Sequence, residues 1–297
     1  MTAVPPRRNG FLRIALATLA AGLLAVVAVT AWTWQRSEAH LAGFALPQPF
    51  TAAIPTDAAS LATGRRLALT RGCIGCHGER LQGEVFGDDF QTGRVVAANL
   101  TKHVHDHPPA VFERALRHGI GHDGRALYSM PSYNFMRLRD GDVAALYAYI
   151  RSLPRVETPL PQPHLGLPVR WAIARGEDAA VPAFLPRVPP LAWQAHPDPA
   201  VRRGEYLAMT SCNECHGFGL RGDDPFAPPG GAPPDLAIVA GYGKDAFVRL
   251  MRTGRPPGGR DLGLMTRVAR GCFAHWTAGE VDDLHAFLSA MGTAATQ

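Results

Sequence analysis

The first pattern along the chain is an uncharged, strongly apolar run of nineteen residues from Ile14 to Trp32. A helix needs about twenty such residues to cross a bilayer. Three arginines precede the run, so the positive-inside bias predicts that residues 1–13 stay in the cytoplasm and that the rest is exported. A cleaved signal peptide is the alternative, but its apolar run is usually ~7–15 residues long. The greater length favours an uncleaved anchor, with Trp32 and Trp34 at the membrane interface.

After this run, apolar residues recur at helical spacing in two similar series. Each series begins with a helix that starts at an aspartate, Asp57 in the first and Asp198 in the second. Each also ends with a helix. Residues 277–280 form a capping box for the last one, and Asp140 or Asp142 is expected to cap its counterpart. Neither series shows the alternation of a strand, so the sequence predicts an all-α fold.

The two series are copies of each other, because three blocks recur in the same order. CHGERLQG (76–83) matches CHGFGLRG (215–222) at an offset of 139, FERALRHG (112–119) matches FVRLMRTG (247–254) at an offset of 135, and GRALYSM (124–130) matches GRDLGLM (259–265) at the same 135. Such an ordered match indicates a duplicated domain. The glycines that close the second block, Gly119 and Gly254, are expected to end a helix.

A proline-rich connector separates the copies. Eleven prolines lie from Pro154 to Pro199, and they forbid regular structure except around residues 168–176. We expect a fairly stiff strap rather than a flexible tether. The predicted organisation is a cytoplasmic tail and transmembrane anchor (1–34), a linker (35–56), a first domain (57–156), the proline-rich linker (157–197) and a second domain (198–297).

Charge narrows the functional classes only slightly. The net charge is +5, but neither predicted domain is basic enough to suggest nucleic-acid binding. Neither domain contains clusters of Lys and Arg among aromatic residues, which are typical of nucleic-acid-binding proteins. No nucleic-acid partner is therefore expected, whereas docking to a charged protein stays open. No Ser/His/Asp arrangement, paired-carboxylate motif or phosphate loop stands out either.

The chemistry of the chain is concentrated in its cysteines, four of which lie in two Cys-x-x-Cys-His groups. Paired zinc ligands normally lie ~15–20 residues apart, whereas these pairs are 139 apart, and a thioredoxin-like pair would need a βαβ setting that is not visible. Cys-x-x-Cys-His is instead the motif of c-type haem attachment, in which two thiols bond to the porphyrin and the histidine lies under the iron. The sequence thus predicts two covalent haem c groups, on Cys73, Cys76 and His77 and on Cys212, Cys215 and His216.

The repeat also suggests the second axial ligand of each iron. Met130 and Met265 occupy the same position of the third block, 53 and 49 residues after the motif histidines, and the other methionines lack such a pairing. A thioether opposite an imidazole raises the potential of haem iron. Both irons would then be six-coordinate and closed, suited to passing electrons rather than binding substrate. The alternative is that both methionines only fill the core.

On these motifs the chain resembles the membrane-anchored bacterial class I c-type cytochromes, particularly the multihaem cytochrome subunits of periplasmic alcohol, aldehyde and similar dehydrogenases. The first copy carries the resemblance in VVAANLT (95–101), DGRALYSMPSY (123–133) and DVAALYAYIRSLP (142–154). The second copy carries it in RRGEYLA (202–208), PPDL (233–236) and LMTRVARGCF (264–273). The resemblance implies two tandem class I cytochrome c domains, each an all-helical fold around one haem.

The resemblance implies further details of each domain. The first helix should cross the last at Gly64 in one copy and at Gly204 in the other. The carbonyl of Pro234 should accept a hydrogen bond from the ring N–H of His216. The first copy departs from the family here, because the corresponding position, near Ala98, has no proline. Cytochrome subunits of the alcohol dehydrogenase type usually carry three haems, whereas this chain has two motifs.

Together, the motifs and the resemblance predict an electron-transfer protein rather than an enzyme. The N-terminal helix would anchor it in the bacterial inner membrane, with the haem domains in the periplasm. It would relay single electrons from a periplasmic dehydrogenase or a quinol-oxidising complex to an acceptor cytochrome or terminal oxidase, and the cytochrome subunit of a dehydrogenase is one form of this role. The alternative is a dihaem peroxidase that keeps one iron open, against which the two matched methionines argue.

Three other features stay open. His103, His105 and His107 would share one side of an extended strand and are candidate metal ligands, but a solvated loop beside the first haem is favoured. Cys272 is expected to be a small core residue rather than a reactive thiol. Four arginines recur in the copies and face either haem propionates or solvent: Arg114, Arg117, Arg249 and Arg252.

Overall fold

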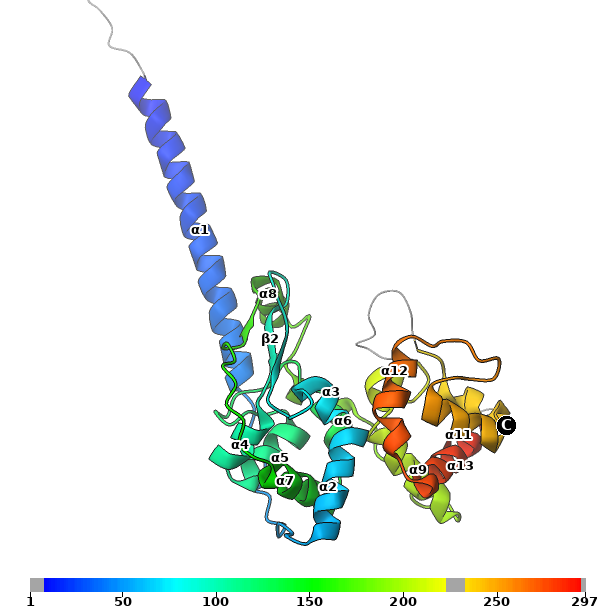
Figure 1. The fold of residues 1–297 in the computed structure, drawn as a ribbon. Helices are drawn as coiled ribbons and strands as arrows, with labels where there is room; N and C mark the ends of the chain where they lie inside the picture. Colours follow the sequence, from blue (N-terminus) through cyan, green and yellow to red (C-terminus); the bar gives the residue numbers. More distant parts are fainter. Residues whose placement is uncertain (1–7, 223–232, 295–297) are drawn as a thin grey trace, which may run out of the picture.

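The computed structural model describes residues 8–222 and 233–294 (Figure 1). Parts of the expected cytoplasmic tail (1–7) and of the expected second domain (223–232 and 295–297) lie outside the described residues. Helix α1 (Arg8–Ala42) projects away from the rest of the molecule, with its large apolar side chains exposed. Within the described ranges it is the one helix long and apolar enough to cross a membrane. A membrane anchor and a signal sequence both have that property.

Each half of the chain after α1 is built on a pair of crossed helices. We call residues 57–156 the first half and residues 198–294 the second half. The pairs are α2 (Ala58–Thr70) with α7 (Asp140–Ser152), and α9 (Pro199–Met209) with α13 (Ala278–Ala294). In each half the first helix of the sequence therefore packs across the last, as the resemblance implies.

Each crossing is centred on a glycine. A Cβ atom added to Gly64 would lie 2.0 Å from the carbonyl oxygen of Ala145, and one added to Gly204 would lie 2.0 Å from that of Asp283. No side-chain carbon fits at that separation, so the two backbones approach closely only because both residues are glycine. The two implied crossing points, Gly64 and Gly204, are confirmed.

Side-chain caps explain where three of these helices begin. Asp57 and Asp198 each accept a hydrogen bond from a backbone N–H in the first turn of their helix. Thr277 and Glu280 exchange side-chain to backbone hydrogen bonds before α13, which is the predicted capping box.

The start of α7 differs from the prediction. Arg139 occupies the N-cap position without a side-chain hydrogen bond, while Asp140 and Asp142 both lie inside the first turn. The expectation that one of them caps the helix was therefore wrong. Their negative charges still stabilise the positive end of the helix dipole, and Asp140 also pairs with Arg117 at 2.7 Å.

Shorter helices lie between the first and the last helix of each half along the chain. They are α3 (Cys73–His77), α4 (Leu100–Asp106), α5 (Pro109–His118) and α6 (Ser132–Phe135) in the first half, and α10 (Asn213–His216), η3 (Leu236–Gly241), α11 (Lys244–Thr253), α12 (Leu264–Gly271) and η4 (Phe273–His275) in the second. Helices α5 and α11 end at Gly119 (φ 64°) and Gly254 (φ 69°). Both glycines are left-handed C-caps, as predicted.

A small antiparallel sheet departs from the all-α expectation. Strand β1 (Glu84–Asp89) pairs with β2 (Gly93–Ala97), which pairs in turn with β3 (His164–Leu165). Strand β1 is exposed on both faces, so its sequence lacks the apolar alternation that would reveal a strand. Strand β3 comes from the proline-rich connector, far along the chain. The fold is mostly helical, with this sheet as an addition to the first half.

The proline-rich connector contains only short elements. They are β3, α8 (Leu167–Arg175), in the predicted place, and two 3₁₀ turns, η1 (Val181–Ala183) and η2 (Leu185–Arg187). Helix α8 ends at Gly176, which has a left-handed φ of 76°. The connector thus touches the small sheet through β3 before it reaches the second half.

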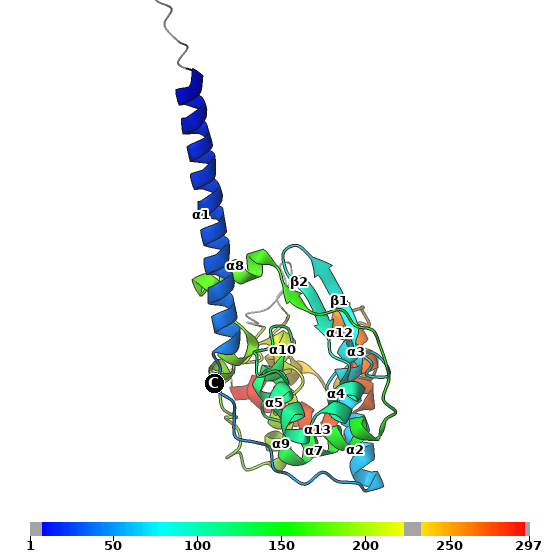
Figure 2. The ribbon, with the colours of Figure 1, turned by 90° about the vertical axis from the view of Figure 1, so that its left-hand side faces the viewer.

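Helix α8 packs across the end of α1 (Figure 2). At 35 residues, α1 is ~52 Å long and exceeds the ~30 Å hydrocarbon core of a bilayer. Its last turns are therefore available for contact. Arg170 is buried there, with its guanidinium 3.7 Å from the ring centroid of Trp34 and a hydrogen bond of 2.7 Å to Glu38. Trp32 and Trp171 meet edge to face at 5.9 Å.

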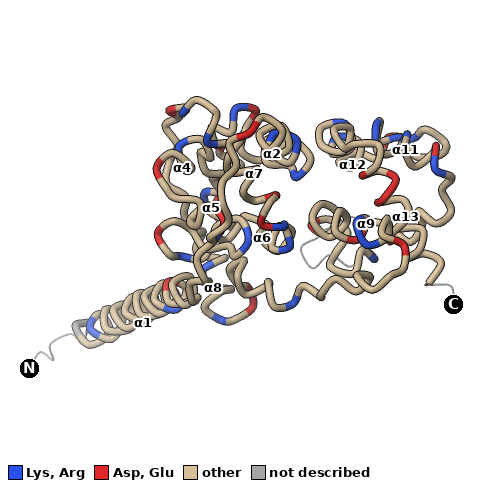
Figure 3. Tube along the Cα trace, turned by 90° about the horizontal axis from the view of Figure 1, so that it is seen from below, with Lys and Arg blue, Asp and Glu red and all other residues tan. Residues whose placement is uncertain are grey.

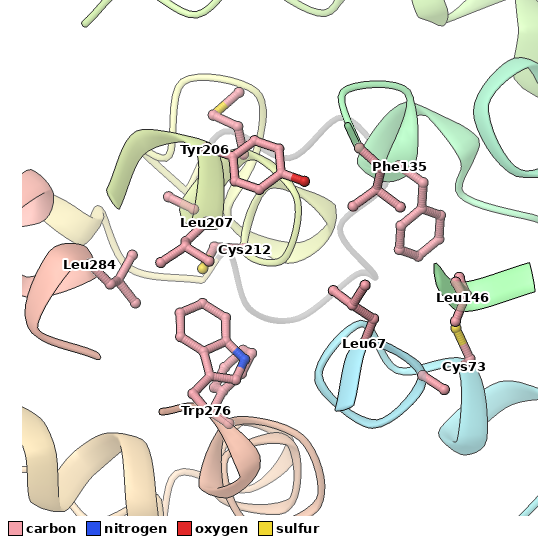
Figure 4. Packing of buried hydrophobic residues seen from close by; sticks show 14 of the residues in the cluster. Leu67, Cys73, Phe135, Leu146, Tyr206, Leu207, Cys212, Trp276 and Leu284 are labelled. Atoms are coloured by element: carbon pink, nitrogen blue, oxygen red, sulfur yellow. The ribbon is translucent and has the colours of Figure 1, made fainter. Parts of the chain in front are cut away.

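The two halves share one hydrophobic core. Figure 4 shows Cys73 and Leu146 on one side of it and Cys212 on the other. An ion pair of 2.5 Å between Arg66 and Glu280 also joins the halves. Charged side chains of both signs are interspersed along the two halves (Figure 3).

Candidate functional site

The first Cys-x-x-Cys-His group forms a single helical turn, α3, directly after α2. Gly72 makes the turn between the two helices with a left-handed φ of 74°. Cys73 is buried and Cys76 is exposed, and no disulfide joins them. Burial raises the pKa of the Cys73 thiol to about 12. A thiol of this kind lacks the lowered pKa of an activated redox pair, so the structure does not favour a thioredoxin-like role.

The second group repeats this arrangement in α10, which follows α9. Cys212 is buried, Cys215 is exposed, and burial raises the pKa of the Cys212 thiol to about 12. Each motif therefore presents one inner and one outer cysteine on a single turn of helix.

Each motif histidine is buried and oriented by one backbone carbonyl. The Nδ1 atom of His77 lies 2.7 Å from the carbonyl oxygen of Ala98, and that of His216 lies 2.9 Å from the carbonyl oxygen of Pro234. With Nδ1–H as the donor, each Nε2 keeps its lone pair for a metal. The Pro234 bond is the one that the resemblance implies. Ala98 supplies the same carbonyl in the first half, so this bond does not require a proline.

The loop after each motif adopts the same unusual backbone. Leu81 and Leu220 have φ values of 56° and 58°, and they are the two non-glycine residues with positive φ in the described part of the chain. A left-handed conformation costs roughly 1–2 kcal/mol, which the complete burial of each leucine offsets. Their carbonyl oxygens accept hydrogen bonds of 2.9 Å from the N–H groups of Leu100 and Leu236. The repeated sequence block is thus a repeated loop structure.

The groups around both motifs fit haem c. Each motif offers two thiols and an imidazole with one ring nitrogen already committed to a carbonyl. Buried polar donors without a partner lie beside them: Nε of Arg71, Nδ2 of Asn213 and Nε1 of Trp276. Buried polar groups normally have partners, and the carboxylates of a bound haem would supply acceptors.

The predicted axial methionines lie in different local structures. Met130 is in the loop before α6, whereas Met265 is in the first turn of α12. Both are partly buried and packed against the core. Cys272, at the end of α12, is also half-buried against the core, and burial raises its thiol pKa, which agrees with a core residue rather than a reactive thiol.

Two of the recurring arginines hold the protein backbone. Arg117 and Arg252 each donate to a backbone carbonyl just before the last helix of their half. Arg114 donates to the Gly121 carbonyl at 2.8 Å, and Arg249 is exposed. Sequence reasoning offered only haem propionates or solvent for these side chains and missed this structural role.

The histidine-rich stretch is neither a strand nor a loop. It forms α4 and its C-terminal cap, so His103 and His107 lie one helical turn apart. His105 faces elsewhere, with its Nε2 atom 3.1 Å from the carbonyl oxygen of Leu153. His122, from the loop after α5, joins the other two instead. No sequence pattern connects His122 to them, because only the fold brings it close.

The chain is similar to known cytochrome proteins. Residues 61–154 match the cytochrome c family. The chain is 30% identical to the cytochrome c subunit of the quinone-dependent alcohol dehydrogenase of Gluconobacter oxydans over 265 residues, 77% of this chain and 54% of that protein. It is 31% identical to the fructose dehydrogenase cytochrome subunit of Gluconobacter japonicus over 182 residues (57% and 36%), and 29% identical to the gluconate 2-dehydrogenase cytochrome c subunit of Pantoea cypripedii over 172 residues (52% and 37%). The chain thus spans about half the length of the first of these relatives, all of which are named as cytochrome subunits rather than catalytic subunits.

Proposed function

The chain belongs to the cytochrome c family through residues 61–154, and on this basis we propose that it is a dihaem electron-transfer subunit anchored in a bacterial inner membrane. Proteins of this family carry covalently attached haem c. The first haem would be attached at Cys73 and Cys76, with His77 as its proximal ligand. Haem iron supplies one-electron redox chemistry when it is bound. The chain's own residues hold the group, orient the axial imidazole and exclude water.

The second haem would be attached at Cys212 and Cys215, with His216 as its proximal ligand, in a second cytochrome c domain over residues 198–297. The observation that carries this proposal is the matched geometry of the two motifs. Both histidines bond to a carbonyl through Nδ1, and both following loops contain a buried left-handed leucine. Two unrelated loops would not share a strained backbone at the same position of a repeat.

Met130 and Met265 would complete the coordination of the two irons. Their matched positions in the third repeat block and their packing against the core support this assignment. A closed iron passes electrons but does not bind peroxide. The alternative function, a dihaem peroxidase, needs one open or labile iron.

The membrane anchor would be α1, with its N-terminus in the cytoplasm and the haem domains in the periplasm. The contacts of Arg170 with Trp34 and Glu38 support an uncleaved helix, because both partners of this buried guanidinium belong to α1. A cleaved signal peptide would predict a mature N-terminus after this helix.

The electron donor would be the catalytic subunit of a periplasmic dehydrogenase, as the names of the relatives suggest, and the acceptor another cytochrome or a terminal oxidase. A quinol-oxidising complex is the other candidate donor. Co-purification of a dehydrogenase subunit from membranes would identify the first arrangement, whereas a chain that purifies alone favours a free-standing carrier.

Haem quantification tests the central proposal. The full chain, produced with a c-type haem maturation system, should contain two haem c groups by the pyridine haemochrome assay. The double variant Cys212→Ala/Cys215→Ala should retain one, attached to the first motif. A wild-type chain with one haem would refute the second site, and rapid peroxide turnover would refute the carrier.

A further inference from the structure

Three histidines outside the haem motifs converge on one point of the first half. His103 and His107 come from the end of α4, and His122 comes from the loop between α5 and α6. One ring nitrogen from each lies within 4.8 Å of the other two. The ring centroids of His103 and His107 are 4.9 Å apart, as are those of His107 and His122.

The chemistry of this cluster is unusual for a packing arrangement. Nε2 of His103 is buried and has no hydrogen-bond partner. A buried polar atom left without a hydrogen-bond partner destabilises the fold, and a bound ligand would satisfy it. Neighbouring charges do not supply one, because Asp106 is engaged by Lys102 and Arg155.

We propose that His103, His107 and His122 form a binding site for a divalent transition-metal ion such as Zn²⁺, separate from the haem irons. Three imidazoles are an established ligand set for zinc, and the fourth position of the tetrahedron is filled by water. Since His122 is exposed, that fourth position faces solvent.

The geometry needs only a modest adjustment to bind the ion. Zinc–nitrogen bonds of ~2.0–2.1 Å place the ligand atoms of a tetrahedral site ~3.4 Å apart. The three nitrogens, which lie within 4.8 Å of one another, must therefore close by at most ~1.4 Å. Rotation of the His122 side chain can provide this movement, because the residue is exposed. Arg114 holds the backbone of the loop through the carbonyls of Gly121 and His122 while leaving the His122 ring exposed.

Two of the imidazoles, those of His103 and His107, are also in the protonation state that binds metal. Burial, together with the neighbouring histidines, lowers the pKa of His103 to about 4, and the same two causes lower the pKa of His107. Metal binding requires neutral imidazole, so protons do not compete with zinc at these two ligands at neutral pH.

The test is a zinc titration by isothermal calorimetry of the full, haem-loaded chain in detergent, after treatment with a chelator. The wild type should bind one Zn²⁺ per chain. His122→Asn should weaken binding by at least about tenfold, since even loss of a residue that only supports a ligand costs ~10–100-fold. Because His122 is exposed, this substitution should leave the haem spectrum and the unfolding temperature unchanged.

Two control variants separate this site from other zinc ligands. His105→Asn changes a histidine of the same helix whose ring bonds to Leu153, and it should bind zinc like the wild type. Cys272→Ser removes the remaining thiol and should also bind like the wild type. The proposal is overturned if the wild type binds no zinc, if His122→Asn binds it with wild-type affinity, or if Cys272→Ser abolishes binding.

Discussion

The glycine at each helix crossing offers a sharp test of the fold. Replacing Gly64 by alanine adds one methyl group to a contact between two backbones. The new Cβ would lie 2.0 Å from the carbonyl oxygen of Ala145 and 2.7 Å from the Cβ of Tyr149. Ordinary carbon–oxygen contacts are ~3.3–3.6 Å, so α2 and α7 must move apart by more than ~1 Å.

Two effects of opposite sign decide the outcome for Gly64→Ala. Alanine favours a helix over glycine by ~1 kcal/mol. Forcing a well-packed contact apart costs ~1–3 kcal/mol and more where the obstacle is backbone, and the widened gap forfeits dispersion energy along both helices. Because the obstacle is a backbone carbonyl, the strain lies at the upper end of this range, about 3 kcal/mol. Strain therefore wins, and we expect the free energy of unfolding to fall by about 2 kcal/mol. Gly204→Ala should behave in the same way, because its Cβ would lie equally close to Asp283.

The matched controls lie in the partner helices. Gly141 in α7 and Gly279 in α13 have no atom within 4 Å of an added Cβ, so alanine there should be neutral or stabilise by up to ~1 kcal/mol. Thermal unfolding of the haem-loaded chain, followed by circular dichroism, is the assay. The melting temperature of a domain of about 100 residues changes by ~4–8 °C for each kcal/mol of stability. The melting temperature of Gly64→Ala should therefore lie at least ~8 °C below that of Gly141→Ala. Equal melting temperatures for these two variants would refute the close backbone contact.

Three further predictions concern the haem sites and the contact between the halves. Met130→Ala and Met265→Ala should each remove about half of the methionine-to-iron charge-transfer absorption of the oxidised protein; a variant that leaves the absorption intact excludes that methionine as a ligand. Pro234→Ala should keep both haems and an unchanged haem spectrum, because the motif histidine bonds to the carbonyl and not to the ring; haem loss would contradict this. Burial of Glu280 raises its pKa, but hydrogen bonds from Thr277 and the cation of Arg66 outweigh this and leave the pKa below 4.5. The charge of Glu280 thus stabilises the fold above the unfolded pKa, and this stabilisation is lost as the pH falls. The stability of Glu280→Gln should therefore decrease less than that of the wild type below about pH 5. Urea unfolding midpoints at several pH values measure this difference.

Much of the helical framework could be predicted because its determinants are local. Side-chain caps, helical spacing and terminal glycines can be recognised from neighbouring residues alone. Most of these patterns also occur in both copies of the repeat, which strengthens the prediction. Thus the two glycine C-caps, the capping box at 277–280 and the helix within the proline-rich connector all agree with the structure. The motif histidines could be proposed as haem ligands for the same reason, since their spacing from the cysteines is local.

The features that could not be predicted from the sequence depend on residues that lie far apart along the chain. Strand β1 is exposed on both faces, and β3 reaches it from the connector, so neither carries a pattern of its own. His122 joins His103 and His107 only through the fold. The support for His77 was hidden for another reason: any residue provides a backbone carbonyl, so the identity of Ala98 carries no signal.

Electron exchange between the two proposed haems depends on how firmly the halves are held. Domains within one chain move relative to each other unless their interface is large and hydrophobic. Here the buried core is continuous between the halves. The residue two positions before the first motif, Arg71, is buried with its guanidinium 5.6 Å from the ring of Trp276, which precedes the last helix of the second half. The ion pair between Arg66 and Glu280 lies on the same two segments. Both Cys-x-x-Cys-His motifs are therefore fixed to a shared core. If each carries the proposed haem, loosening this interface should slow electron exchange between the two haems without removing either one.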